Sequence, residues 1–134
     1  MRLTDDVLLA RAIPSALKDR ADLVRAYAGV DGDVVESIKA QSAQIRAIKG
    51  KRLRDLTEPE REAARLAFVY AEQYERGLDD AQPERRAREN ARRYREVRLR
   101  LWGKTEFEQR IDDTTHVVSI WKLKDLFENI EEAA

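Results

Sequence analysis

Turn-forming residues are scarce in this chain, and their scarcity limits its possible fold more than any other feature. Five glycines and three prolines are spread over 134 residues. The stretches between them carry apolar residues three and four positions apart, which is the repeat of an amphipathic helix. A sheet of many short strands needs more turns than this, so the spacing predicts an all-α protein.

Capping residues show where the helices are expected to begin. The sequence Thr57-Glu58-Pro59-Glu60 combines an N-cap threonine, a proline in the first turn and a glutamate placed to complete a capping box. Thr4 and Asp33 are interpreted as N-caps of earlier helices, and Pro14 is expected to break the first of them. Pro83 is expected to open a long arginine-rich helix.

The last predicted helix follows the capping residues 112–115 and has an unusually wide apolar sector. Such a helix is either central in the fold or docked against another chain. We therefore expect a protein partner, with self-association as the simplest case. With this helix, the predicted fold is a single-domain irregular bundle of about six helices over residues 1–134. The candidate partner-binding residues are Trp121, Leu126, Phe127 and Ile130.

Cysteine and long apolar runs are both missing from the sequence. Without cysteine there is no disulfide framework, no thiolate metal site and no cysteine nucleophile. No apolar run approaches the roughly 18 residues that span a bilayer, and the first residues lack the apolar core of a signal peptide. We therefore expect a cytoplasmic protein that does not enter a membrane.

The net charge is zero, from 26 basic and 26 acidic residues, but the charges are grouped in blocks. Residues 45–54 hold five basic and no acidic side chains, and residues 85–100 hold eight arginines against two glutamates. Residues 55–84 and 105–134 have an excess of acidic side chains. Neutrality therefore reflects opposed blocks, and local binding of phosphates or of a complementary protein surface stays open.

One flank of the arginine-rich helix consists of Arg85, Arg88, Arg92 and Arg95, spaced three and four residues apart. One interpretation is a solvated flank whose arginines pair with acidic residues of this chain or of a partner chain. The other is a site for the backbone of RNA or DNA, because four arginines along about 15 Å of helix can follow phosphates. Further candidates for nucleic-acid contact come from the 45–54 block: Lys49, Lys51, Arg52 and Arg54.

Signals for catalysis are few. The glycines are too scattered for a phosphate-cradling loop, and a single histidine excludes multi-histidine metal sites within one chain. Arg110 and His116, with five residues between them, resemble the Arg-x(4–6)-His motif of HEPN ribonucleases. The resemblance covers those two residues, and it implies RNA cleavage by paired protomers. No catalytic residue, metal ligand, cofactor or small-molecule ligand is predicted from the rest of the sequence.

These observations lead to one main hypothesis and two alternatives. The main hypothesis is a non-enzymatic helical structural or adaptor subunit of a larger assembly, which binds a partner protein through charged helix faces and an apolar C-terminal helix. The first alternative is a helical subunit that binds the backbone of RNA or DNA through the arginine-rich helix. The second is the HEPN-like ribonuclease.

Overall fold

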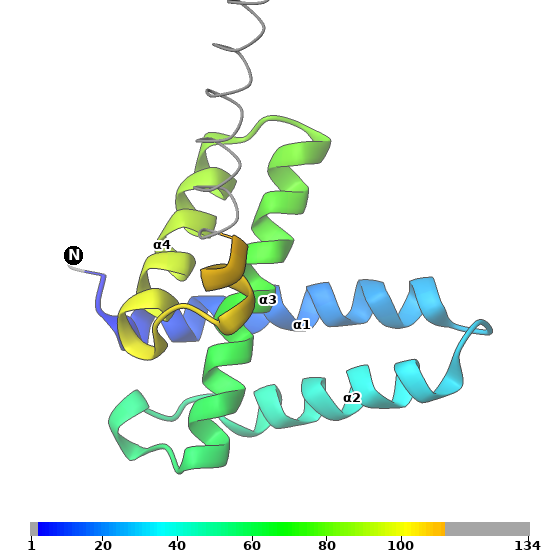
Figure 1. Cartoon of the computed structure of the whole chain (residues 1–134), viewed down its shortest axis with the longest axis horizontal. Helices are drawn as coiled ribbons and strands as arrows, with labels where there is room; N and C mark the ends of the chain where they lie inside the picture. Colours follow the sequence, from blue (N-terminus) through cyan, green and yellow to red (C-terminus); the bar gives the residue numbers. More distant parts are fainter. Residues whose placement is uncertain (1–2, 112–134) are drawn as a thin grey trace, which may run out of the picture. The chain divides into compact units, whose positions relative to one another are not determined.

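The computed structural model describes residues 3–111, and every regular element in that range is a helix (Figure 1). The prediction of an all-α fold is therefore confirmed.

Two compact units are distinguished, Met1–Trp102 and Gly103–Ala134. In the second unit, residues 106–111 form a short helix. The single domain over residues 1–134 stays a prediction. The first unit contains the helices α1 (Asp5–Tyr27), α2 (Gly32–Ala47), α3 (Glu58–Ala81) and α4 (Arg85–Trp102), and the 3₁₀ turn η1 (Leu53–Asp55).

Helix α1 begins where the sequence predicts but continues further. The hydroxyl of Thr4 accepts a hydrogen bond from the backbone N–H of Val7 at 3.3 Å and so caps the first turn. The expected break at Pro14 is wrong, since this residue lies inside the helix with its ring exposed. An interior proline costs about 3 kcal/mol. Burial of the α1 face that packs against α3, which includes Leu9 and Ile13, outweighs this cost.

Helix α2 is capped two residues earlier than the sequence suggested. The N-cap is Asp31, and the prediction of Asp33 is wrong. The carboxylate of Asp31 accepts hydrogen bonds from the backbone N–H groups of Asp33 and Val34 at 3.1 and 3.2 Å. Asp31 has the extended backbone of an N-cap, whereas Asp33 already lies in the first helical turn. The helix ends before Gly50, whose φ of +82° is a left-handed conformation that favours glycine.

Helix α3 is the centre of the bundle, because it packs against α1, α2 and α4 (Figure 1). Its predicted capping box is present. The Thr57 hydroxyl accepts from the N–H of Glu60 at 3.4 Å, and the Glu60 carboxylate accepts from the N–H of Thr57 at 3.1 Å. Phe68 is fully buried, and its ring centre lies 6.2 Å from that of Tyr94 and 6.1 Å from that of Trp102. Small buried residues of α3 let the neighbouring helices approach closely: Ala63, Ala64, Ala67 and Ala71.

A buried arginine joins α1, α2 and α3. Arg20 of α1 is 7% exposed, and its guanidinium carbon lies 3.5 Å from the centre of the Tyr70 ring on α3. The same guanidinium donates hydrogen bonds to Gln41 of α2 at 2.9 Å and to Asp19 at 2.8 Å. The charge is therefore stacked on an aromatic ring, hydrogen-bonded and paired, which offsets the cost of removing it from water.

Candidate binding groove between α3 and α4

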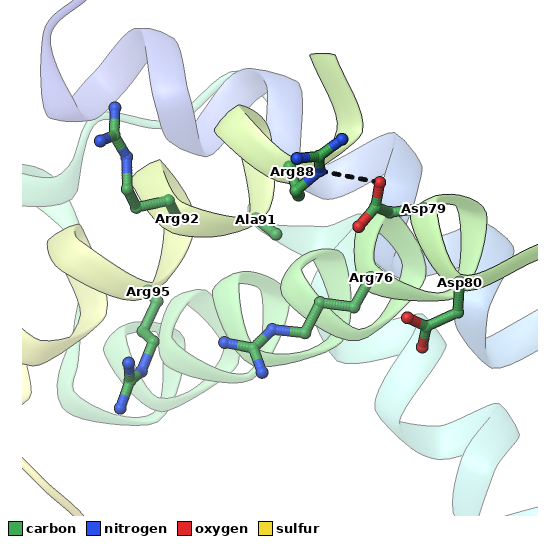
Figure 2. A pocket seen from close by; sticks show the side chains of 7 residues that line it. All are labelled: Arg76, Asp79, Asp80, Arg88, Ala91, Arg92 and Arg95. Atoms are coloured by element: carbon green, nitrogen blue, oxygen red, sulfur yellow. Dashed lines mark hydrogen bonds and ion pairs between the residues drawn. The ribbon is translucent and has the colours of Figure 1, made fainter. Parts of the chain in front are cut away.

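The C-terminal part of α3 and the outer face of α4 border an open cavity of about 370 Å³ (Figure 2). Helix α4 follows α3 after a loop of three residues, so the end of α3 lies beside the start of α4. Ala91 is buried between the two helices, and its small side chain leaves space above it. We call this cavity the arginine groove. It is lined by Arg76, Asp79, Asp80, Arg88, Ala91, Arg92 and Arg95.

Helical spacing sets the positions of the charged side chains in the arginine groove. Arg88, Arg92 and Arg95 follow one another on one face of α4 at intervals of four and three residues. Arg76 extends from α3 in the direction of Arg95 (Figure 2). Four guanidinium groups from two helices therefore share one cavity with the carboxylates of two aspartates.

Asp79 fixes the end of the arginine groove that lies nearest the α3–α4 loop. Its Oδ1 atom accepts hydrogen bonds from the backbone N–H of Glu84 at 2.9 Å and from Nε of Arg88 at 3.0 Å. The backbone N–H of Glu84, followed by Arg88, lowers the pKa of the Asp79 carboxyl. The ionised carboxylate thus holds the loop and one α4 arginine in place.

The other arginines of the groove are less tightly held. Arg76 lies 3.4 Å from Glu72, and Arg92 lies 3.8 Å from Glu96, each on its own helix. Arg95 forms no ion pair with any residue in the range 3–111. Ion pairs at exposed side chains contribute about 0–1 kcal/mol. Acidic groups of a ligand can therefore replace the exposed Arg92–Glu96 pair at little cost. The Glu72 side chain is largely buried, so its pair with Arg76 costs more to break.

The structure brings together three of the four arginines that the sequence placed on the α4 flank. Arg85 does not line the cavity, and it pairs with Glu89 at 3.1 Å on the exposed surface. Sequence reasoning missed Arg76, Asp79 and Asp80 as groove residues. The available signal was the short predicted connection, because helices joined by a short loop become antiparallel neighbours.

The basic residues of the 45–54 block lie elsewhere. Lys51 pairs with Glu60 near the start of α3 and lowers the pKa of that carboxyl by hydrogen bonding, and Arg54 lies 4.0 Å from Asp55. The arginine groove lies near the opposite end of α3, which at 1.5 Å per residue is about 36 Å long. The two basic sets predicted from the sequence therefore do not form one continuous surface. All four candidates from the block are exposed: Lys49, Lys51, Arg52 and Arg54.

A buried carboxylate lies where α1, α3 and α4 meet. Glu75 of α3 is 8% exposed, accepts a hydrogen bond from the hydroxyl of Ser15 at 3.4 Å, and is also hydrogen-bonded to Asn90. Burial raises the pKa of Glu75, because the charged form loses water that these hydrogen bonds only partly replace. This carboxylate belongs to the core and does not line the arginine groove.

Several predicted residues lie outside the described part of the chain. These include His116 and the C-terminal candidates Trp121, Leu126, Phe127 and Ile130. Arg110, the other member of the HEPN-like pair, is exposed and lies 3.8 Å from Glu106. Partner binding through the C-terminal residues and RNA cleavage by the pair both stay predictions.

Neither a metal centre nor a membrane span is found in the described residues. No three acidic, histidine or cysteine side chains among residues 3–111 are grouped closely enough to hold a metal ion. No helix in the same range is long and apolar enough to cross a bilayer. The chain matches no protein-family model, no curated protein and no solved structure.

Proposed function

We propose that this protein is a non-enzymatic cytoplasmic adaptor that binds an acidic segment of a partner protein in the arginine groove. The observation that carries the proposal is the presence of four guanidinium groups, from two helices, around one cavity. Arginine suits this task because its planar donors form two parallel hydrogen bonds to one carboxylate.

The mixture of charges in the arginine groove favours a protein ligand over a nucleic acid. Asp79 and Asp80 line the same cavity as the arginines and repel a continuous row of phosphates. A protein segment carries both signs of charge, so its own basic side chains can lie beside these carboxylates. The zero net charge of the chain adds no long-range attraction toward a polyanion.

One observation supports the nucleic-acid alternative. The side chains of Arg85, Arg88, Arg92 and Arg95 are all exposed on α4. They extend along about 15 Å of helix, a length that covers more than one phosphate of a strand. If all four arginines contact phosphates of duplex DNA, a plot of log K against the logarithm of salt concentration should have a slope of about −3.6. The binding affinity should then fall about 150-fold between roughly 50 and 200 mM salt.

Titrating the full chain into each class of ligand tests the proposal. A fluorescent glutamate-rich peptide is compared with DNA and RNA oligonucleotides by anisotropy at low salt. We expect the peptide to bind, and the single substitutions Arg92→Gln and Arg95→Gln each to weaken its binding. Arg85→Gln is the matched control, because it removes the same charge from the same helix outside the cavity.

Two results would count against the adaptor proposal. The nucleic-acid alternative is favoured if oligonucleotides bind and the peptide does not, and if Arg85→Gln weakens oligonucleotide binding as much as Arg95→Gln does. If neither class of ligand binds at low salt, the arginine groove is not an anion-binding site.

A further inference from the structure

A second groove lies between α1 and α2, which run antiparallel as a helical hairpin (Figure 1). Its cavity has a volume of about 330 Å³. The lining residues recur every three or four positions on each helix, so each helix contributes one continuous face. We call this cavity the hairpin groove. From α1, its lining consists of Leu17, Ala21, Val24 and Arg25.

The floor of the hairpin groove is formed by small and apolar side chains. Ala21 of α1 and Ser42 of α2 are small residues at the centre of their two lines. The Ser42 hydroxyl donates a hydrogen bond to the Ile38 carbonyl at 3.2 Å, so it needs no partner from a ligand. Leu17 and Val24 are half-buried on either side of Ala21 and are separated by two helical turns, or about 10.5 Å. This surface has room for the apolar side chains of two turns of another helix.

The charges around the hairpin groove have one sign. Arg25, Lys39 and Arg46 line it, and no carboxylate does. Because the helices are antiparallel, Arg46 lies toward the Leu17 end, and the other two cations lie toward the opposite end. Arg25 and Lys39 each pair with an acidic residue three positions earlier on their own helix, at the exposed surface. Arg46 forms no ion pair within the part of the chain that the structure describes. The lining of the hairpin groove therefore carries cations at both ends, with positive charge that is unpaired within residues 3–111 at the Arg46 end, in contrast to the mixed lining of the arginine groove.

We propose that the hairpin groove binds an acidic amphipathic helix of a partner protein. Apolar side chains at positions i, i+4 and i+7 of that helix match the spacing of Leu17, Ala21 and Val24. A carboxylate at one end of the apolar row meets Arg46. One at the other end competes with Asp22 and Glu36 for Arg25 and Lys39, whose exposed pairs are weak. The apolar floor distinguishes this ligand from a nucleic acid, and the absence of a carboxylate among the described lining residues disfavours a basic amphipathic helix. This second site is independent of the arginine groove, whose lining is mostly polar.

Three synthetic peptides test the proposal with the full chain carrying Arg92→Gln and Arg95→Gln, because glutamate-containing peptides are also expected to bind in the arginine groove. The probe is an amphipathic helix with leucine at positions i, i+4 and i+7 and glutamate at both ends. The first control peptide carries lysine in place of glutamate, and the second carries serine in place of leucine. Anisotropy should detect binding of the probe alone. Equal binding of either control peptide would overturn the proposal.

Variants of the protein then locate the binding site. Ala21→Glu places a carboxylate in the centre of the floor, and Arg46→Glu reverses a charge at one end. Each should weaken binding of the probe at least tenfold, equivalent to about 1.4 kcal/mol. Arg54→Glu makes the same charge change on an exposed side chain outside the groove and should leave binding unchanged.

Two checks keep these results interpretable. Both groove positions are exposed and glutamate is a good helix former, so circular dichroism should show folded proteins. The Arg92→Gln and Arg95→Gln substitutions are present throughout, so any binding of the probe in the arginine groove is weakened. Failure of that groove to bind a ligand would therefore leave this test intact. An unchanged affinity in Ala21→Glu and Arg46→Glu would refute the hairpin groove as the binding site.

Discussion

Phe68→Ala should remove a large part of the stability of the helical bundle. The Phe68 side chain is fully buried on α3, and the rings of Tyr94 and Trp102 lie 6.2 and 6.1 Å from it between centres. Burying a phenylalanine side chain contributes about 1.5–3 kcal/mol. The vacated space adds a cavity cost, so the total expected loss is about 3–5 kcal/mol. A domain of this size has a free energy of unfolding of about 5–15 kcal/mol.

Urea unfolding, followed by circular dichroism, measures this loss. With a slope of about 1–3 kcal/mol per molar urea, the midpoint should fall by at least about 1 M at unchanged slope. Phe107→Ala is the matched control, because that side chain is 71% exposed and its removal should change stability by less than about 0.5 kcal/mol. A loss below about 1.5 kcal/mol for Phe68→Ala, or similar losses for both variants, would refute the packing argument.

Three further predictions concern a buried carboxyl group, a helix cap and a pair of glycines. Because burial raises the pKa of Glu75, the folded state keeps this proton to higher pH than the unfolded state. Stability should therefore fall as the pH rises from about 4 through the raised pKa, and Glu75→Gln should flatten that slope in urea unfolding at a series of pH values. Thr57→Ala removes the hydroxyl of the α3 capping box and should cost about 1 kcal/mol in the same assay, whereas Thr57→Ser should cost little. Gly50→Ala should destabilise by about 1 kcal/mol, because φ is +82° there. Gly77→Ala should stabilise the folded protein by about 0.5–1 kcal/mol, because this glycine lies inside α3 and an added Cβ would lie in open space. A change of stability in the same direction for both glycine variants would contradict this reasoning.

Local chemistry explains which parts of the fold were predictable. The capping box at Thr57 and Glu60 depends on four neighbouring residues, and the structure contains it as expected. The break at Pro14 was wrong because the outcome depends on burial against α3, a helix more than 40 residues away in the sequence. The choice between Asp31 and Asp33 depends on backbone conformation, which two nearby acidic residues do not reveal.

In the candidate site, too, the features set within one helix were predictable and those set by packing between helices were not. Helical periodicity alone placed Arg88, Arg92 and Arg95 on one face of α4. Arg76 and Asp79 come from another helix, and their place in the cavity depends on how α3 and α4 pair. Periodicity within one helix carries no such information. The hairpin groove also depends on how two helices pair, so it was not predicted from the sequence. Each of its two faces has the ordinary residue pattern of an amphipathic helix.

The buried contact of Arg20 also restricts how this sequence can vary. Lysine has the charge but not the planar group that stacks on Tyr70 while it donates to both Gln41 and Asp19. Arg20 directly precedes Ala21 on α1, so the contact that joins α1 to α2 and α3 lies next to the hairpin groove. Sequences that share this architecture should therefore change the arginine, the glutamine and the tyrosine together or not at all. Joint variation at these three positions would identify distant relatives that retain the groove, even where the overall sequence has diverged.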